Sequence, residues 1–219
     1  MSKKVIAAVV GGVLALVLLA GAAVWVFPVL TVKSFEITGN EHSTPQEIEE
    51  ASHVAQGSNL VRLDAREAAS NIVSLPWVES ATVSRAFPST VRVELTEHTA
   101  VAFIKEGEAT QLVDDTGEKF AMDTPPEDAV ELSGKIDEDA EVLQPAVEIL
   151  AALPQPLRAQ VRTLEVDGRY SMTLVTKDDR RVYWGASEDN HNKAIAFEDV
   201  LKLEGSQWNI SNPELVTSR

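Results

Sequence analysis

The four histidines are the side chains best suited to metal binding or proton transfer near neutral pH, and their spacing supports no local site. They are His42, His53, His98 and His191. No two have the HxxxH spacing that places two imidazoles on one face of a helix. They lie in four different predicted elements, so neither a metal site nor a nucleophile–base pair has local support. The sequence therefore favours four surface histidines, with no metal site and no cofactor.

Other catalytic motifs are also missing from the sequence. The chain has no cysteine, which excludes disulfides, cysteine nucleophiles, iron–sulfur clusters and Cys-ligated zinc. No serine lies in a Gly-x-Ser-x-Gly or Ser-x-x-Lys pattern, and the 11 glycines form no phosphate-binding loop. These observations predict a non-enzymatic protein with no small-molecule substrate.

Residues 114–118, Asp-Asp-Thr-Gly-Glu, resemble half of a calcium loop but lack its alternating ligands and its glutamate at position 12. A β-turn with solvent-exposed acids is the favoured interpretation. The turn lies in an acidic stretch, 106–141, with 13 acids and 2 lysines, or 2 − 13 = −11. This stretch is either a solvated loop and helix face, or a surface that attracts a basic partner or repels anionic wall polymers and lipids.

The charge of the chain is concentrated after its first 30 residues. The 219 residues hold 19 Lys and Arg against 34 Asp and Glu, a net charge of −15. Lys3 and Lys4 are the only charged residues among the first 30, so residues 31–219 carry 17 − 34 = −17. Because nucleic-acid binding depends on phosphate neutralisation by basic residues, this balance argues against it.

Residues 5–27 form an apolar segment of 23 residues without a charge. As a helix the segment would extend roughly 35 Å, enough for a hydrocarbon core of about 30 Å. The lysines before it place residues 1–4 in the cytoplasm by the positive-inside rule. A cleaved signal peptide, with a small-residue site at 20–22, is the alternative, although cleavable apolar regions are usually shorter. Both interpretations export residues 31–219.

The pattern of residues 31–99 predicts a small α+β module. An alternating strand at 35–38 ends at a Gly-Asn turn, and Thr44 and Asp64 each begin a helix with a glutamate three residues later. Two β-rich runs follow at 81–85 and 90–95. We expect two helices packed on one face of a three-stranded sheet.

Residues 100–219 have a β-rich pattern with two amphipathic helices. The expected strands are 101–104, 111–113, 161–166, 171–176 and 181–184, with a short strand or extended tail at 208–217. The expected helices are 139–153 and 190–203, and the proline-containing acidic segment 123–135 reads as a loop. This order predicts a multi-stranded antiparallel sheet with two helices.

Three stretches together resemble the bacterial FtsQ/DivIB family of cell-division proteins. They are the Phe35–Asn40 strand and turn with its Thr-Pro-capped helix, the run from Leu75 to Glu97, and the hairpin from Leu112 to Phe120. The resemblance implies a POTRA domain at 31–99 and an FtsQ-type β domain at 100–219, after the transmembrane helix. It also implies a bitopic scaffold of the division machinery, located in the cell membrane and enriched at the septum.

The partners implied by the resemblance are FtsB-like and FtsL-like division proteins. Their binding surface falls by position on Arg169, Tyr170, Ser211, Asn212, Glu214, Leu215 and Val216. A final strand with an unpaired edge would bind such a partner by β-augmentation, although it could instead simply complete the sheet. Two other classes are considered: a POTRA-containing assembly or secretion component, and an anchored or secreted cell-wall enzyme.

Overall fold

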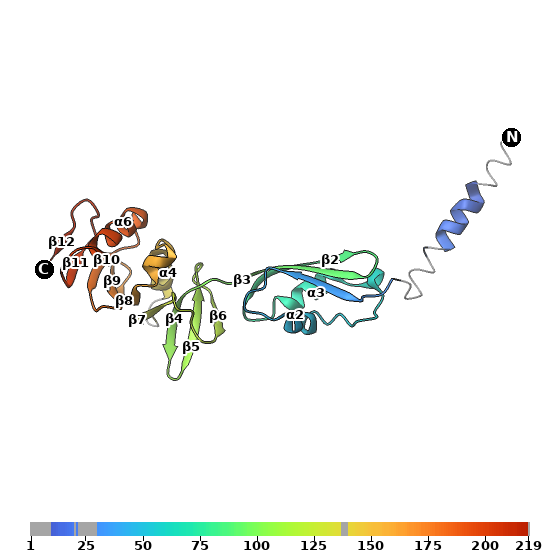
Figure 1. Ribbon diagram of the computed structural model, residues 1–219, viewed down its shortest axis with the longest axis horizontal. Helices are drawn as coiled ribbons and strands as arrows, with labels where there is room; N and C mark the ends of the chain where they lie inside the picture. Colours follow the sequence, from blue (N-terminus) through green and yellow to red (C-terminus); the bar gives the residue numbers. More distant parts are fainter. Residues whose placement is uncertain (1–9, 20, 22–29, 137–139, 219) are drawn as a thin grey trace. The chain divides into compact units, whose positions relative to one another are not determined.

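The structure is a computed structural model that describes residues 10–19, 21, 30–136 and 140–218 (Figure 1). Residues 10–19 and 21 are helical. The other residues of the expected transmembrane segment, and the expected cytoplasmic segment 1–4, lie outside the described residues. Within the described ranges, no helix is both long and apolar enough to cross a membrane. The chain divides into two compact units, Met1–Glu97 and His98–Arg219.

The first unit folds in the predicted order of strand, helix, helix, strand, strand. Its elements are β1 (Ser34–Thr38), α2 (Pro45–Ala51), the 3₁₀ helix η1 (Leu60–Arg62), α3 (Ala65–Ile72), β2 (Val78–Ala86) and β3 (Thr90–Glu97). The central β3 pairs parallel with β1 and antiparallel with β2. Ile48 of α2 and Ile72 of α3 are buried in one core with Val91 and Val93 of β3. The predicted α+β module is confirmed.

Both predicted helix starts are confirmed by their capping hydrogen bonds. The Glu47 N–H donates to Thr44 Oγ1 at 3.3 Å, and the Thr44 N–H donates to Glu47 Oε2 at 2.8 Å. Asp64 Oδ1 accepts from the N–H groups of Arg66 and Glu67, each at 3.1 Å. Each cap satisfies N–H groups that have no partner inside the helix.

The second unit is a nine-stranded sheet in the order β12-β11-β10-β9-β8-β7-β4-β5-β6. Its strands are β4 (Ala100–Glu106), β5 (Ala109–Asp114), β6 (Lys119–Met122), β7 (Val130–Gly134), β8 (Val161–Gly168), β9 (Ser171–Thr176), β10 (Arg181–Gly185), β11 (Gln207–Asn209) and β12 (Thr217–Ser218). The sheet is mixed, so the prediction of an antiparallel sheet is wrong. The parallel pairs are β4 with β7, β7 with β8 and β10 with β11.

Two helical connections and one unpredicted strand account for the parallel pairs. The segment 123–135, expected to be a loop, contains β7, whose Val130 and Leu132 are buried. Helical segments then connect β7 to β8 and β10 to β11. A helical crossover returns the chain to the starting end of the sheet, so that the next strand runs parallel to the previous one.

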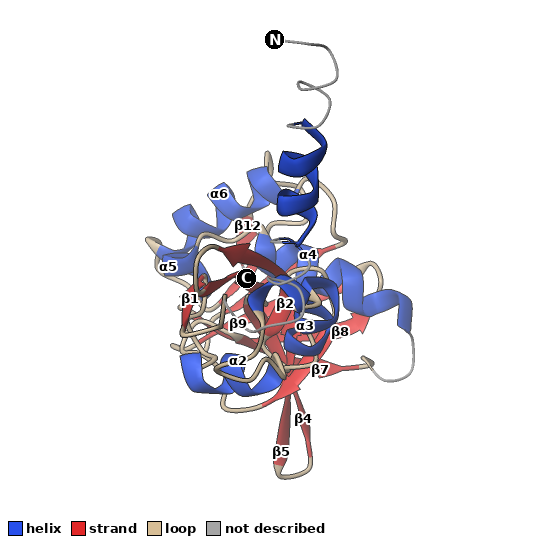
Figure 2. Ribbon diagram, turned by 90° about the vertical axis from the view of Figure 1, so that its right-hand side faces the viewer, coloured by secondary structure: helices blue, strands red, loops and turns tan. Residues whose placement is uncertain are grey.

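The described residues of the second unit include the α-helices α4 (Leu143–Ala151), α5 (Gln155–Arg158) and α6 (Asn190–Leu201) (Figure 2). A short 3₁₀ helix, η2 (Ala140–Val142), precedes α4. Pro154 and Pro156 were expected only to end the preceding helix, so the four-residue α5 was not predicted. In the structure Pro154 is the N-cap of α5 and Pro156 lies in its first turn. Ile149 of α4 and Phe197 of α6 are fully buried with Leu164, Leu174 and Trp184 of the sheet.

The expected C-terminal strand at 208–217 is two short strands. β11 pairs parallel with β10, and β12 pairs antiparallel with β11. Residues 210–216 form the connection between them. The prediction of a short strand or extended tail over these positions is therefore wrong, because the chain reverses direction between the two strands.

Candidate functional site

The candidate site is the C-terminal edge of the second unit's sheet, formed by β10, β11 and β12. Strand β12 is the last in the sheet order, and among the described residues it pairs with β11 alone. One side of a terminal strand keeps backbone N–H and C=O groups that can pair with an added chain. The edge is only two residues long, so side chains of the neighbouring connection would have to extend any contact surface.

The connection between β11 and β12, residues 210–216, contacts β10 through Ile210 and Ser211. Ile210 is fully buried, and its N–H donates to the Tyr183 carbonyl at 3.0 Å. Ser211 lies against Gly185, where an added Cβ would approach the Ser211 Cβ to 3.1 Å. Gly185 also has a φ of +78°, which glycine adopts without strain. Ser211 is further held by Asn209 Oδ1, which accepts from its N–H at 2.9 Å and its hydroxyl at 2.7 Å.

The rest of the connection is a turn that presents one apolar side chain. Asn212 Oδ1 accepts from the Glu214 N–H at 3.1 Å, and the Asn212 carbonyl accepts from the Leu215 N–H at 3.1 Å. Leu215 is 67% exposed, whereas Val216 packs against the core. Asn212 thus shapes the turn, and Leu215 is its exposed apolar contact point.

Arg169 and Tyr170 occupy the turn between β8 and β9. Arg169 Nη1 forms an ion pair with Glu141 Oε2 at 3.1 Å, and the guanidinium lies 5.9 Å from the centre of the Tyr170 ring. Tyr170 is 67% exposed. Its carbonyl accepts a long hydrogen bond of 3.5 Å from the Tyr183 hydroxyl.

Strand register places the Arg169–Tyr170 turn and Ser211 at the same end of neighbouring strands. Ser171, which follows Tyr170, begins β9, and Met172 pairs with Gly185 at the end of β10. Ser211 contacts that same Gly185 from the end of β11. The structure therefore brings both groups of predicted site residues to one end of the edge strands.

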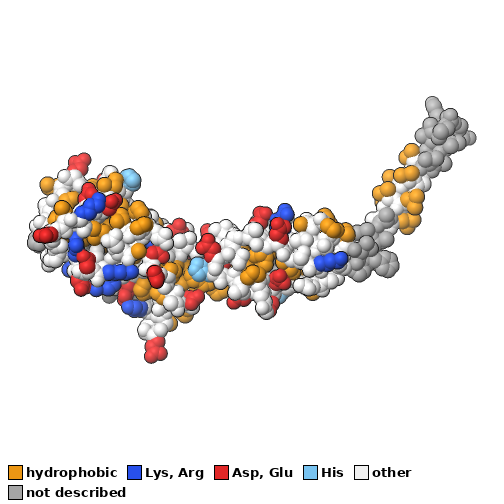
Figure 3. Space-filling view, viewed as in Figure 1, with side chains coloured by type: hydrophobic (Ala, Val, Ile, Leu, Met, Phe, Trp, Pro, Cys, Tyr) orange, Lys and Arg blue, Asp and Glu red, His pale blue; other side chains and the backbone are white. Residues whose placement is uncertain are grey.

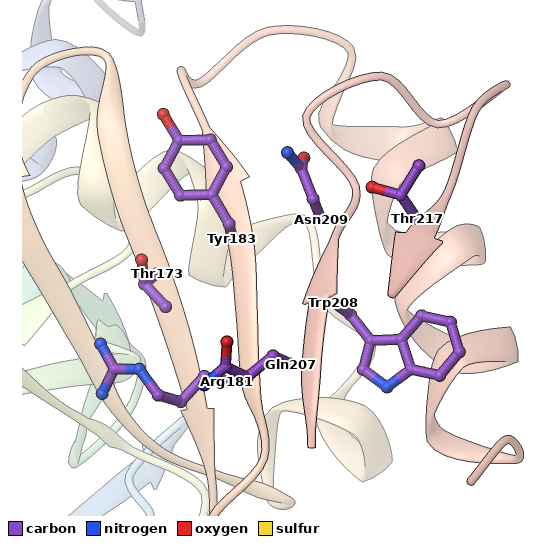
Figure 4. Close-up of a pocket in the computed structure, with 7 residues that line it drawn as sticks. All are labelled: Thr173, Arg181, Tyr183, Gln207, Trp208, Asn209 and Thr217. Carbon is purple, nitrogen blue, oxygen red and sulfur yellow. The ribbon is translucent and has the colours of Figure 1, made fainter. Parts of the chain in front are cut away.

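A polar row crosses the sheet beside this end and was missed in the sequence. Register aligns Thr173, Tyr183, Asn209 and Thr217 across β9 to β12. Figure 4 shows them side by side around a hollow of about 410 Å³ that Gln207 also lines. Within β10, exposed or half-buried residues alternate with the buried Val182 and Trp184, and that alternation was the available signal.

Arg181 fixes one side of the hollow through Glu165 of β8. Its two terminal nitrogens bond both carboxylate oxygens, one of them at 2.8 Å. The hydrogen bonding from Glu165 raises the pKa of Arg181, outweighing the effect of burial. Two parallel charge-assisted hydrogen bonds hold an arginine in one orientation. The charge at the hollow is therefore compensated, and the surface presents hydroxyl, amide and aromatic groups.

The turn at Asp114, outside the candidate edge, differs from the prediction. Asp114 and His98 are both buried, and His98 Nδ1 lies 2.7 Å from Asp114 Oδ2. Asp114 Oδ1 accepts from the Thr116 N–H at 2.9 Å, the Thr116 hydroxyl at 2.8 Å and the Glu118 N–H at 2.8 Å. The predictions of a surface histidine at 98 and a solvent-exposed acid at 114 are therefore wrong. In the described residues, no group of three or more His, Asp or Glu side chains has a geometry that could hold a metal.

A second buried carboxylate, Glu97, closes the sheet of the first unit. Its oxygens accept from the N–H groups of Glu41 at 3.1 Å, His42 at 2.7 Å and Ser43 at 2.8 Å. Burial, the largest single influence, raises the pKa of Glu97, but the hydrogen bonds from residues 41–43 together outweigh it and hold the pKa below 4.5. The His42 ring stacks on Trp77 at 3.8 Å. Glu97 therefore ties the end of β3 to the β1–α2 loop.

Replacing Glu97 with glutamine is expected to destabilise the first unit by about 2 kcal/mol, because an amide NH₂ would face backbone donors. The carboxylate is favoured in the folded state, so its contribution is complete above the ordinary pKa of 4.5 and is lost as the pH falls through the lower folded value. The difference in the free energy of unfolding between wild type and Glu97→Gln, measured with urea, should accordingly shrink below pH 4.5. Glu94→Gln, an exposed position on the same strand, is the matched control; an equal loss there would contradict the assignment.

Two sequence models of protein families match the chain. The model described as POTRA domain, FtsQ-type, matches residues 30–98. The model described as Cell division protein FtsQ/DivIB, C-terminal, matches residues 102–214, a range that includes β10 and β11 and ends just before Leu215 and β12.

Curated relatives match over most of the chain. The Cell division protein FtsQ of Corynebacterium glutamicum is 42% identical, with 100% of both chains covered. The protein of the same name from Streptomyces coelicolor is 28% identical over 86% of this chain and 78% of that one. For Mycobacteroides abscessus FtsQ the identity is 29%, and the match spans 90% of this chain but 64% of the relative. Among solved structures, the major extracytoplasmic domain of the cell division protein DivIB from Geobacillus stearothermophilus aligns with a TM-score of 0.37 and 16% identity, over 47% of this chain and 87% of that one.

Proposed function

The chain belongs to the FtsQ/DivIB family of cell division proteins, and from this membership we propose that it is a non-catalytic, single-pass membrane scaffold of the division machinery. Its domains would be a cytoplasmic segment at 1–4, a transmembrane helix at 5–27, a POTRA domain at 31–99 and a β domain at 100–219. The 23 uncharged residues after Lys3 and Lys4 support the anchor and its orientation. The protein would act at the septum, with its bulk outside the cytoplasm.

We further propose that the β10–β12 edge binds an FtsB-like protein and, through it, an FtsL-like protein. The observation that carries this proposal is the terminal position of β12, next to a turn that presents the exposed Leu215. A partner strand added to β12 would gain backbone hydrogen bonds, while side-chain contacts would select the partner. Tyr170, in the turn before β9, and the polar row at Tyr183 lie beside this edge and would extend the contact beyond two residues.

In-cell photocrosslinking tests this proposal directly. With a photoreactive amino acid at Leu215, the full-length protein is expected to capture an FtsB-like division protein, identified by mass spectrometry. The same probe at Met122, which is 66% exposed on the opposite edge strand β6, is the matched control. Capture of the same protein at equal yield from both positions, or of no division protein from Leu215, would overturn the edge assignment.

Depletion of the protein is expected to produce filamentous cells, because a missing scaffold stops septum assembly while growth continues. Microscopy of depleted cells, with re-expression of the wild-type chain as the control, checks the cellular role. Normal division after depletion would refute that role whatever the crosslinking result.

A further inference from the structure

Several basic side chains lie at the end of the first unit's sheet where β1 begins. The first rung of the sheet is Ser34 with Thr90 and Ala86. Lys33 precedes this rung, and its N–H donates to the Ser89 carbonyl at 2.8 Å. Arg85 lies one residue before Ala86 in β2 and is exposed. Basic groups from two strands therefore meet at this end.

The η1 segment adds a third basic residue to the same end. Thr31 forms an isolated bridge with Asn59, and the Leu60 N–H donates to the Leu30 carbonyl at 2.8 Å. Arg62, which is exposed, ends η1. Arg85 donates to the Leu63 carbonyl and thereby joins the β2 strand to the η1 segment. We call Lys33, Arg62, Arg85 and Phe87 the basic end of the first unit.

Phe87 gives the basic end an apolar tip. It lies in the turn between β2 and β3, directly after Ala86, and is 61% exposed. On the face shown in Figure 3, basic and hydrophobic side chains lie together at this end of the first unit. Exposed aromatic rings next to basic side chains are the combination found where proteins meet the headgroup region of a bilayer.

Acidic residues lie mainly at the other end of the same sheet. Glu94 pairs with Thr38 at the last rung of β1, and Glu97 pairs with Val78 at the start of β2. The exposed Glu79 follows Val78. Near the η1 segment, Asp64 and Glu67 line the same hollow as Arg62, and the Asp64 carboxylate also caps α3. Charge is thus separated along the strands although the exported part of the chain is strongly acidic.

The chain length between the proposed anchor and this end is short. Leu30 is already hydrogen-bonded to Leu60, so only three residue steps separate it from residue 27, the end of the proposed span. At about 3.3–3.6 Å per residue this distance is at most about 11 Å. The basic end therefore has to stay near the lipid headgroups if residues 5–27 cross the bilayer.

We propose that the basic end of the first unit docks on an anionic lipid surface, with Lys33, Arg62 and Arg85 facing lipid phosphates and Phe87 in the interface. This inference rests on the proposed anchoring of the chain. The docking would orient the first unit with its acidic end away from the membrane. Lipid is favoured over a protein partner by the charge of the cluster and by its short tether to the bilayer.

The absence of cysteine makes a site-specific probe straightforward in the full-length protein. An apolar fluorophore on Phe87→Cys is measured in vesicles of phosphatidylglycerol and phosphatidylcholine that contain a headgroup nitroxide quencher. We expect strong quenching at position 87 and little at Glu79→Cys, on the acidic end. Substituting both Lys33 and Arg62 with glutamine should reduce the bound population at position 87 by about fivefold or more, whereas Arg92→Gln, which removes a basic residue of β3 outside the basic end, should not.

Each outcome separates the docking from the anchoring. Equal quenching at 87 and 79 overturns the docking, as does quenching at 87 that is unchanged in phosphatidylcholine vesicles or after the double substitution. A probe at Leu16→Cys reports the anchor through quenchers placed in the acyl chains. If Leu16 is quenched and position 87 is not, the docking alone is wrong. If Leu16 is not quenched, the proposed anchor is wrong and the docking fails with it.

Discussion

Replacing Leu215 with aspartate is expected to weaken binding of the FtsB-like partner about thirtyfold or more. Leu215 is the exposed apolar side chain of the turn beside β12, and truncation of a central apolar contact typically costs about 2 kcal/mol. An aspartate would also place an unpaired charge against the added strand. The folded protein should tolerate the change, because an exposed turn side chain contributes little to packing.

Affinity for the Leu215→Asp variant is measured with purified full-length protein in nanodiscs and the extracytoplasmic part of the partner. Met122→Asp is the control, since Met122 has nearly the same exposure on the opposite edge of the sheet. The free energy of unfolding of both variants should lie within about 0.5 kcal/mol of the wild-type value. Wild-type affinity for Leu215→Asp, or an equal loss for Met122→Asp, would exclude the β12 edge as the binding site. Asn212 is less suitable for this test, because its side chain holds the turn together.

The first unit could be predicted because its boundaries are set by local chemistry. Thr44 and Asp64 cap their helices with their own side chains, so sequence spacing alone reports both starts. Gly39 ends β1 with a φ of +89°, and an added Cβ would lie 1.9 Å from the Leu95 carbonyl oxygen. The turn therefore requires glycine, and the sequence shows one there.

The second unit was predicted less well because its pairing is decided by distant contacts. Strand β7 lies in a proline-containing acidic segment, and it forms a strand because β4 and β8 pair with it on both sides. The separation of β11 from β12 depends on Ile210, which enters the core and bonds to Tyr183. The family resemblance selected residues that the fold brings to one end of the sheet, but the turn that shapes that end could be seen only in the fold.

The pairing of Asp114 with His98 was also missed, since the two residues are 16 positions apart and no local spacing links them. The apolar residues before Asp114 were read as the end of a strand and the acids as a solvated turn. In the structure the N–H groups of Thr116 and Glu118 donate hydrogen bonds to Asp114, the first residue of the turn, and Phe120 stacks on His98 at 4.6 Å. A turn signal identifies where the chain reverses, and it does not reveal which of its polar groups becomes buried.

Replacing Asp114 with alanine is expected to destabilise the second unit by about 3 kcal/mol, because each buried donor that loses its acceptor costs about 1–3 kcal/mol. The change leaves His98, two N–H groups and the Thr116 hydroxyl without their acceptor. Asp115→Ala removes the same charge from an exposed neighbour, so it should cost well under 1 kcal/mol. Urea unfolding of the full-length protein in detergent gives the free energies, and hydrogen exchange of peptides from residues 98–218 assigns the loss to the second unit.

The pH dependence distinguishes a charged contact at Asp114 from simple loss of packing. Burial is the largest single influence and raises the pKa of Asp114, but the hydrogen bonds from Thr116, Glu118 and His98 outweigh it, so the pKa lies below 3.8. The carboxylate therefore stabilises the fold fully above pH 3.8, and this contribution disappears as the pH falls through the lower folded pKa. The stability difference between wild type and Asp114→Ala should narrow over that acidic range. A difference that stays constant down to pH 2 would instead mean that the side chain acts through its volume, because only the ionised carboxylate makes all of these contacts.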